Sequence, residues 1–236
     1  MSATPSDKRS KRAVASTRHT LGLLLAILVM GMLAIRNPIS EWPKTMVSQQ
    51  ARLVLYVKIL VLLWLWVGYV WLGLRRSTTS LRALIDDSRW TARSWLRYLA
   101  VGIAGWIAYL AISAGLSSML HPSSEALRGL QAMLPQTPLE RTLWAAFALS
   151  AGVCEEIVYR GYLLRQFRAL TGSTLAALVL QAVCYSLIHL ALPVEMLVGV
   201  VVLGLLLGGL AVWQKSLVPG MILHVGVGLV ALVRPG

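Results

Sequence analysis

The fold and the chemistry of this chain are decided by the stretch Cys154-Glu155-Glu156-Ile157-Val158-Tyr159-Arg160. It lies between the apolar runs 143–149 and 162–164, so two adjacent acids and one arginine stand inside a hydrophobic segment. A carboxylate at membrane depth costs about 2.5–3.5 kcal/mol on insertion scales. A chain retains such groups where they perform chemistry, carry ions or pair with a cation, so this stretch is the first candidate for a functional site.

The composition indicates a membrane protein with a single domain. Hydrophobic residues make up 57% of the 236 residues and charged residues only 13%, whereas a soluble domain carries about 25% charged residues. The net charge of +13 does not indicate nucleic-acid binding, because the Lys and Arg residues lie in short loops between apolar runs. Cys154 and Cys184 both fall inside apolar segments, so we expect buried free thiols and no disulfide framework.

Seven apolar stretches predict an all-α, polytopic transmembrane helix bundle, since a helix needs about 20 residues to cross the hydrocarbon layer. They cover residues 20–35, 53–74, 98–119, 142–164, 174–192, 194–213 and 217–233. The first stretch lacks a small-residue cleavage site, so we expect an uncleaved span and not a signal peptide. The chain then divides into a disordered basic cytoplasmic tail (1–19), N-terminal transmembrane helices with an amphipathic loop (20–138) and a helical core that carries the acids (139–236).

The distribution of Lys and Arg predicts the orientation. With the N-terminus in the cytoplasm, the inner segments hold fourteen of the 22 basic residues and the outer segments six, a bias that favours this orientation and places the C-terminus outside. Residues 75–97 carry Trp90 and Trp95 among arginines, which predicts an amphipathic helix at the headgroup layer. Thr137-Pro138-Leu139-Glu140 has the form of a capping box and predicts the start of the helix with the acids.

The two acids point about 100° apart on a helix, so they cannot do the same work. Glu156 and Arg160 are four residues apart in the favourable order for an ion pair. The simplest assignment makes this pair a scaffold and leaves Glu155 for chemistry. In the alternative, both acids are structural and hold the bundle by salt bridges, although one arginine does not account for two acids.

Two later apolar segments each carry one histidine. Gly172-Ser173 is the predicted turn between two antiparallel helices, and the acids and His189 lie at about equal distance from it, on the order of 25 Å. We therefore expect Glu155 and His189 to meet about 10–15 Å inside the cytoplasmic boundary. His224 is expected about 10 Å into the last span, at the same depth. A lone histidine on an apolar face is more often a satisfied core residue, so the hypothesis depends on the convergence of three polar groups at one depth.

With these residues the chain resembles the CPBP family (CAAX prenyl protease and bacteriocin-processing, Abi type) of intramembrane endopeptidases. The family pattern is Glu-Glu-x-x-x-Arg, then aromatic-x-x-x-His, a Gly-rich helix and a final His-x-x-x-Asn or Asp. The resemblance covers residues 139–233 and rests on Glu155, Glu156, Arg160, Tyr185 (where phenylalanine is usual), His189, Gly204, Gly208 and His224. Gly204 and Gly208 alone predict only close helix packing. Gly228 stands where the family has Asn or Asp.

The resemblance implies that activated water hydrolyses a peptide bond. Glu155 is then the general base, His189 holds and orients the water, and His224 donates to the oxyanion, while Glu156 with Arg160 fixes the helix. Gly228 offers no side-chain donor. Either His224 acts alone, another donor substitutes, or the protein is slower or inactive.

The resemblance favours a metal-free glutamate mechanism, so we expect no cofactor. The alternative is a zinc ion bound by Glu155, His189 and His224 with one open position.

The implied partners are a peptide or protein substrate, prenylated or membrane-anchored, and the lipid bilayer, with no nucleic acid. The expected location is the inner (cell) membrane of a bacterium. Two other functions stay open. A proton-coupled transporter also places acids and histidines at mid-membrane, although it more often shows an inverted repeat, and the sequence has none. A non-catalytic immunity or scaffold protein is the second, and Gly228 favours it.

Overall fold

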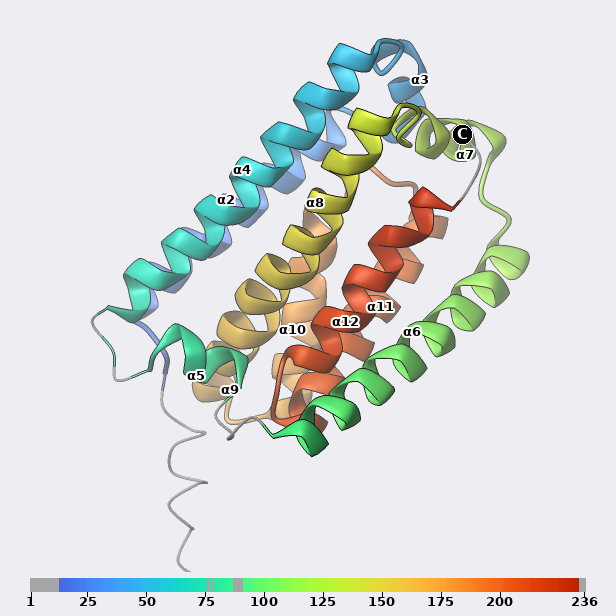
Figure 1. Ribbon diagram of the computed structural model, residues 1–236. Coiled ribbons are helices and arrows are strands. Elements are labelled where there is room, and N and C mark those ends of the chain that lie inside the picture. The colour runs from blue at the N-terminus through green and yellow to red at the C-terminus, as the bar shows by residue number, and fades with distance from the viewer. Residues whose placement is uncertain (1–12, 76, 78, 87–90, 234–236) are drawn as a thin grey trace, which may run out of the picture.

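The computed structural model describes residues 13–75, 77, 79–86 and 91–233. In this part of the chain every regular element is a helix (Figure 1), so the predicted all-α fold is confirmed. The elements in chain order are α2 (Thr17–Ile35), η1 (Ile39–Glu41), α3 (Trp42–Thr45), α4 (Gln49–Leu74), α5 (Leu81–Ile85), α6 (Ala92–Leu120), α7 (Ser124–Ala132), α8 (Pro138–Glu155), η2 (Glu156–Leu163), α9 (Leu164–Thr171), α10 (Thr174–Leu187), α11 (Val194–Gln214), α12 (Val218–Leu229) and η3 (Val230–Leu232).

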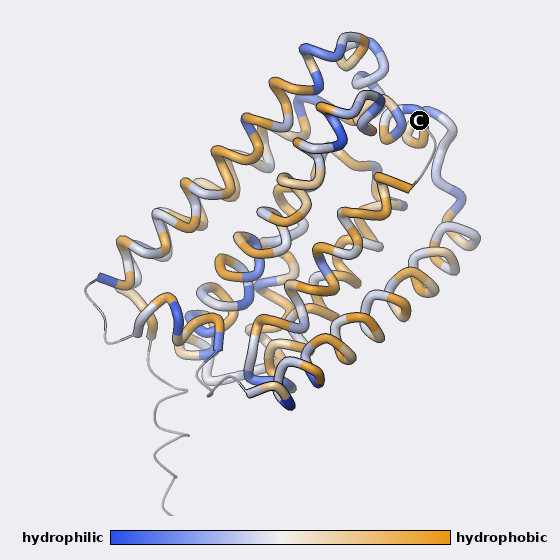
Figure 2. The backbone as a smooth tube through the Cα atoms, in the orientation of Figure 1, coloured by the Kyte–Doolittle hydropathy of each residue, from blue (hydrophilic) through white to orange (hydrophobic). Residues whose placement is uncertain are grey.

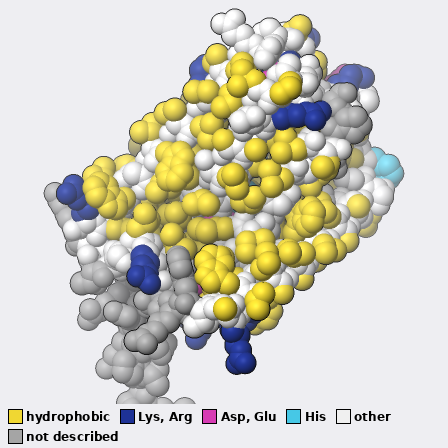
Figure 3. Space-filling model, viewed as in Figure 1, with side chains coloured by type: hydrophobic (Ala, Val, Ile, Leu, Met, Phe, Trp, Pro, Cys, Tyr) yellow, Lys and Arg dark blue, Asp and Glu magenta, His cyan; other side chains and the backbone are white. Residues whose placement is uncertain are grey.

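Among the described residues, five helices are long and apolar enough to cross a membrane, namely α2, α4, α6, α11 and the continuous helix Pro138–Thr171. The apolar helices Thr174–Leu187 and Val218–Leu232 are shorter, so the predicted count of seven spans is not confirmed. Figure 2 shows that hydrophobic residues dominate the long helices, and in Figure 3 apolar side chains cover the middle of one face while Lys and Arg lie toward its ends. This distribution is that of an integral membrane protein.

The continuous helix Pro138–Thr171 is the central element of the bundle (Figure 1). Its α8 portion packs against α4 and against α12, α12 also contacts α6, and α10 contacts α11. In its most apolar window 56% of the residues are buried, compared with 6% for α6, so the acids lie on the best-covered helix.

The central helix changes its hydrogen-bonding pattern at the two acids. α8 ends at Glu155 and continues as the π-helix η2, whose eight residues are all buried, before α9 begins. π-Helical segments are rare and occur frequently at functional sites. The predicted span 142–164 is therefore part of a longer helix, and the sequence did not indicate its π-helical part.

The predicted turn at Gly172-Ser173 is confirmed. Gly172 has φ +68°, a left-handed conformation that glycine adopts without strain, and its N–H donates to the Arg168 carbonyl oxygen. The Ser173 hydroxyl oxygen accepts the Ala176 N–H and caps α10.

α10 ends earlier than the sequence predicts. The apolar stretch 174–192 suggested one span, but the helix stops at Leu187 and a turn leads to Pro193. Proline lacks an N–H and disfavours helical backbone in the residue before it, which opposes an α-helix through this position. His189 consequently lies on a turn and not within a helix.

The N-terminal boundary also differs from the prediction. Residues 1–12 of the predicted tail 1–19 lie outside the described residues. Val14 is buried, however, and its N–H donates to Gln166 Oε1 at 2.9 Å. Because α2 begins at Thr17, the bundle already includes part of the predicted tail.

The loop 75–97 differs as well. Its described part contains the short helix α5, whose Leu84 is buried against the central helix. Trp95 belongs to the start of α6, which begins at Ala92, six residues before the predicted span 98–119. Trp90 lies outside the described residues. In the described part of this loop, the one separate helix is thus the five-residue α5, which packs on the bundle and is not the predicted amphipathic helix at the headgroup layer.

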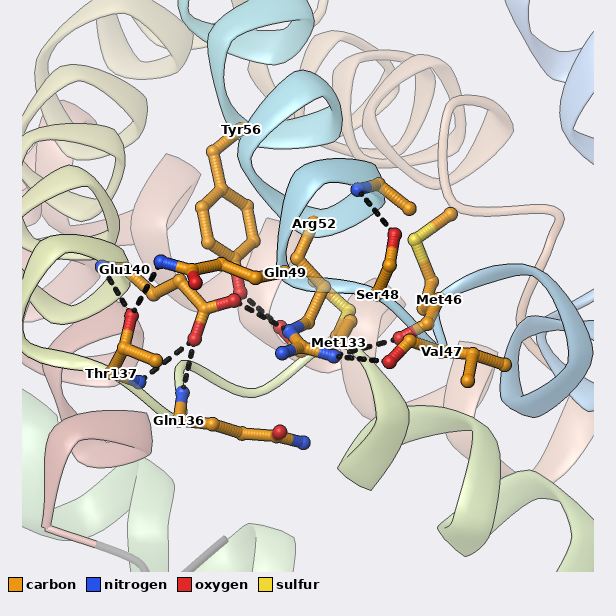
Figure 4. Close-up of polar contacts among 11 residues, drawn as sticks. Met46, Val47, Ser48, Gln49, Arg52, Tyr56, Met133, Gln136, Thr137 and Glu140 are labelled. Carbon is orange, nitrogen blue, oxygen red and sulfur yellow. Dashed lines mark hydrogen bonds and ion pairs between the residues drawn. The ribbon is translucent and has the colours of Figure 1, made fainter.

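The start of the central helix is held by a buried ion pair (Figure 4). The predicted capping box is confirmed, because the Thr137 hydroxyl oxygen accepts the Glu140 N–H and Glu140 Oε2 accepts the Thr137 N–H at 2.8 Å. Glu140 Oε1 accepts a hydrogen bond from Arg52 Nε at 2.7 Å, and Arg52 Nη1 donates to the Met46 carbonyl oxygen. Since both charged side chains are buried, the pair ties α4 to the start of α8.

We expect Arg52→Ala to lower the free energy of unfolding by about 3–5 kcal/mol, because it leaves the Glu140 carboxylate buried without a cation. The control is Lys44→Ala, which removes the exposed Lys44–Glu41 pair and should leave stability nearly unchanged. Denaturant unfolding in detergent micelles, followed by tryptophan fluorescence, measures both. Equal losses in the two variants would contradict the role assigned to Arg52.

Candidate active site

The two acids and His224 form one buried cluster. Glu155 ends α8, Glu156 begins η2, and His224 lies on α12, which packs against α8. Glu156 Oε1 is 3.0 Å from His224 Nδ1, and Glu155 Oε2 is 3.6 Å from His224 Nε2. The two adjacent carboxylates therefore approach opposite nitrogens of one imidazole.

Glu156 determines which nitrogen of His224 carries a proton. A carboxylate only accepts hydrogen bonds, so the 3.0 Å contact requires a proton on Nδ1. Nε2 then faces Glu155 and the Tyr185 hydroxyl, which is 3.4 Å away. The 3.6 Å separation from Glu155 is too long for a hydrogen bond, and the contact becomes an ion pair only when Nε2 also carries a proton.

The predicted ion pair of Glu156 and Arg160 is present. Arg160 Nη1 donates to Glu156 Oε1 at 2.9 Å, and neither side chain is exposed. Arg160 Nη2 donates to the Gly204 carbonyl oxygen on α11, and the guanidinium lies 4.5 Å from the centroid of the Tyr185 ring. One arginine thus links the central helix to α10 and α11 and balances the charge of Glu156.

His189 projects from the turn after α10 and is partly buried. Its Nδ1 lies 2.9 Å from the Tyr185 carbonyl oxygen. Because a carbonyl only accepts, Nδ1 carries the proton and Nε2 of the neutral ring keeps its lone pair. The His189 ring packs against the Tyr185 ring, with the two centroids 4.8 Å apart. The structure therefore places Glu155 within 3.6 Å of His224, and it connects His189 to His224 through the Tyr185 ring.

Tyr185 connects the two histidines. Its ring centroid is 4.8 Å from that of His189 and 6.0 Å from that of His224. The same ring packs edge-on against Tyr159 at 5.3 Å. The aromatic member of the predicted motif thus lies at the centre of the cluster.

Gln181 is a site residue that the sequence reasoning missed. It is fully buried, and its Nε2 donates at 2.8 Å to the Gly204 carbonyl oxygen that also accepts from Arg160. Gln181 Oε1, Arg160 Nε and Glu156 Oε2 have no hydrogen-bond partner among the described residues. The sequence contains a signal for Gln181, because it is a polar residue in an apolar segment. It lies four residues before Tyr185 and eight before His189, a spacing that places residues on one face of a helix.

Gly204 and Gly208 lie where α11 approaches α10, as their spacing predicts. A Cβ at Gly204 would lie 3.1 Å from Ala182 Cβ, and one at Gly208 would lie 2.6 Å from Gln181 Nε2. The absence of side chains here lets Gln181 and Arg160 reach the backbone of α11.

Gly228 lies one turn after His224, where α12 crosses α8. A Cβ at this position would lie 2.8 Å from Ala148 Cβ, and the Gly228 carbonyl oxygen accepts a hydrogen bond from Trp144 Nε1 at 2.9 Å. Glycine at 228 therefore serves the close packing of the two helices that carry Glu155 and His224.

We expect Gly228→Ala to lower the free energy of unfolding by about 1–3 kcal/mol, because the new methyl group overpacks the contact with Ala148. Gly209→Ala is the matched control, since nothing lies within 4 Å of a Cβ there, and it should be neutral or stabilising by up to about 1 kcal/mol through helix propensity. The same micelle unfolding titration measures both. A stable Gly228→Ala protein would mean that the helices can move apart at little cost.

The described residues contain no group of three or more His, Cys, Asp or Glu side chains arranged to hold a metal ion. Of the three residues in the zinc alternative, His224 has its Nδ1 3.0 Å from Glu156 Oε1, and its Nε2 lies 3.4 Å from the Tyr185 hydroxyl. Cys154 and Cys184 are both buried free thiols, as expected.

Comparison with known proteins identifies one family. Residues 137–230 match the family model of type II CAAX prenyl endopeptidases of the Rce1-like kind. No curated protein and no solved structure matches the chain. The matched range begins at the Thr137 cap and contains Glu155, His189 and His224. The resemblance that the sequence predicted is confirmed over residues 137–230, which match the Rce1-like CAAX protease model.

Proposed function

We propose that this protein is an intramembrane endopeptidase that hydrolyses a peptide bond with water activated by Glu155. The observation that carries the proposal is the buried cluster in which Glu155 and Glu156 face opposite nitrogens of His224, while His189 and His224 both pack against the Tyr185 ring. Glu156 already balances Arg160, and no described Lys or Arg pairs with Glu155. Glu155 is therefore the carboxylate left for chemistry.

In the proposed reaction, Glu155 removes a proton from a water molecule as the water oxygen forms a bond to the substrate's carbonyl carbon. His189 Nε2 accepts a hydrogen bond from the remaining O–H and orients the oxygen, because its Nδ1 proton is held by the Tyr185 carbonyl. The C–N bond then breaks, and the proton on Glu155 moves to the leaving amine nitrogen. The products are a carboxyl terminus and an amine.

His224 stabilises the negative charge that develops on the carbonyl oxygen. It donates from Nε2 when the ring carries both protons, and the Glu156 carboxylate stabilises this imidazolium through Nδ1. Arg160 balances the Glu156 charge and holds the carboxylate in place. Glu156 and Arg160 are thus positioning residues for His224.

We propose a peptide or protein substrate whose tail is prenylated or otherwise anchored in the bilayer. The matching family is described by its prenyl endopeptidase activity. In addition, the cluster lies among apolar helices, so a substrate must bring its scissile bond to the membrane, which a lipid anchor does.

We expect Glu155→Gln to lower cleavage by about 10³-fold, because the amide cannot accept the water proton. The probe is a farnesylated peptide with a Cys-aliphatic-aliphatic-X tail between a fluorophore and a quencher, presented in lipid vesicles. Glu41→Gln, whose carboxylate pairs with exposed Lys44, is the control and should cleave as wild type does. The unfolding midpoint of both variants should match wild type.

The same variant separates the rival functions. A transporter would lose proton-coupled flux in vesicles on Glu155→Gln and would not cleave the probe. A scaffold or immunity protein would show neither activity, and wild-type and Glu155→Gln cells would then contain the same membrane peptides by mass spectrometry. Either result would contradict the protease.

We propose that the reaction needs no metal cofactor. The support is that the described residues contain no group of three or more His, Cys, Asp or Glu side chains arranged to hold a metal ion. We expect full cleavage of the farnesylated probe after exhaustive treatment with a zinc chelator and removal of the chelator. Activity that disappears on stripping and returns with stoichiometric Zn²⁺ would instead support zinc on Glu155, His189 and His224.

We also propose seven crossings with the N-terminus in the cytoplasm of a bacterial cell. The apolar helices alternate between the two ends of the bundle (Figure 1), and more of the basic residues lie at the end with α5 and α9. The test introduces single cysteines at the α5 end and at the α7 end and labels them from outside the cell. Labelling at the α5 end, and not at the α7 end, would contradict this orientation.

A further inference from the structure

The Tyr185 hydroxyl lies inside the catalytic cluster, on the side of His224 that faces Glu155. Its oxygen is 3.4 Å from His224 Nε2, which is its one hydrogen-bonding contact to the described residues. This distance exceeds the usual range for a hydroxyl donor. A nearly fully buried hydroxyl with such a weak partner retains its capacity to donate to another group.

The separation of the two polar atoms fits a shared ligand. An oxyanion is stabilised by donors about 2.7–3.1 Å from the oxygen atom. Two donors 3.4 Å apart can both reach that distance from a single oxygen. The Tyr185 hydroxyl and His224 Nε2 can therefore bind one atom between them, next to the Glu155 carboxylate.

We propose that the Tyr185 hydroxyl is a catalytic donor that binds the substrate's carbonyl oxygen together with His224 Nε2–H. The inference rests on the proposed function. As the water oxygen bonds to the carbonyl carbon, the C=O π electrons move to the oxygen and both hydrogen bonds strengthen. When the C–N bond breaks, those electrons return to the carbon–oxygen bond. The tyrosine keeps its proton throughout.

The aromatic ring of Tyr185 does not require the hydroxyl. The ring lies below the Arg160 guanidinium and contacts Tyr159 and His189, and phenylalanine would make the same contacts. The hydroxyl adds only the contact to His224. Burial of a poorly bonded hydroxyl costs about 1–3 kcal/mol, so its presence here indicates a polar function.

The packing around His224 explains why this donor comes from α10. The residue one turn after His224 is Gly228, and a Cβ there would collide with Ala148. A donor side chain from that turn of α12 is thus excluded by the close approach of α8. Tyr185 reaches the same imidazole from the other side of the cluster.

The test compares Tyr185→Phe with wild type on the farnesylated probe. We expect kcat to fall about 10²-fold, the typical loss for one oxyanion donor, while KM and the unfolding midpoint stay unchanged. A phosphinic peptide of the same sequence, whose anionic tetrahedral group imitates the intermediate, should bind about 10²-fold more weakly to Tyr185→Phe. The control is Tyr162→Phe, which removes a buried hydroxyl bonded to Thr20 and should change neither quantity.

Three results would overturn the assignment. If Tyr185→Phe cleaves as fast as wild type while Glu155→Gln is inactive, the hydroxyl has no catalytic role and the proposed function stands. If the loss of kcat comes with an equal loss in Tyr162→Phe, or with a lower unfolding midpoint, the hydroxyl is structural. If wild type cleaves neither the probe nor its own membrane peptides, the proposed function and this inference fail together.

Discussion

The site depends on a single carboxylate, that of Glu156, which is shared by a guanidinium and an imidazole. In an apolar interior a lone carboxylate is too costly to keep, and Arg160 makes its burial tolerable. The same oxygen, Oε1, holds Nδ1 of His224, so the charge that Arg160 balances also orients the imidazole. Without Glu156, Arg160 would lose its anion and His224 would lose the contact that directs Nε2 toward Glu155.

Two departures from regular α-helix occur in the segments that supply the site residues. The central helix becomes π-helical at Glu156, so successive side chains turn by a different angle where both acids must face α12. α10 stops at Leu187, which frees the backbone to turn and to present His189. Non-helical backbone at membrane depth is tolerated where protein or a polar cavity surrounds it. The π-helix begins at Glu156, and the turn with His189 follows Tyr185, whose hydroxyl lies 3.4 Å from His224 Nε2.

The sequence predicted the parts of this structure that depend on local spacing. The Glu156–Arg160 pair, the Thr137 capping box and the Gly172 turn follow from residues at most four apart, and all are present. The sequence did not predict the contacts between segments that are distant along the chain. The Arg52 side chain meets Glu140 only because α4 packs on α8, and the end of α10 and the π-helix reflect tertiary packing that no periodicity records. Gln181 was visible as a polar residue in an apolar segment, but its partner Gly204 was not.

Gly228 shows how packing and chemistry constrain each other in this bundle. From the sequence alone it was a missing donor, and three explanations stayed open. In the structure it is the place where α12 comes close enough to α8 for one imidazole to contact two adjacent acids on the central helix. A larger residue would push Ala148 away and move His224 from Glu156. The close approach of α12 and α8 that assembles the cluster thus leaves no space for a side chain at position 228. Any further donor to this site has to come from a different helix that faces His224, as Tyr185 on α10 does.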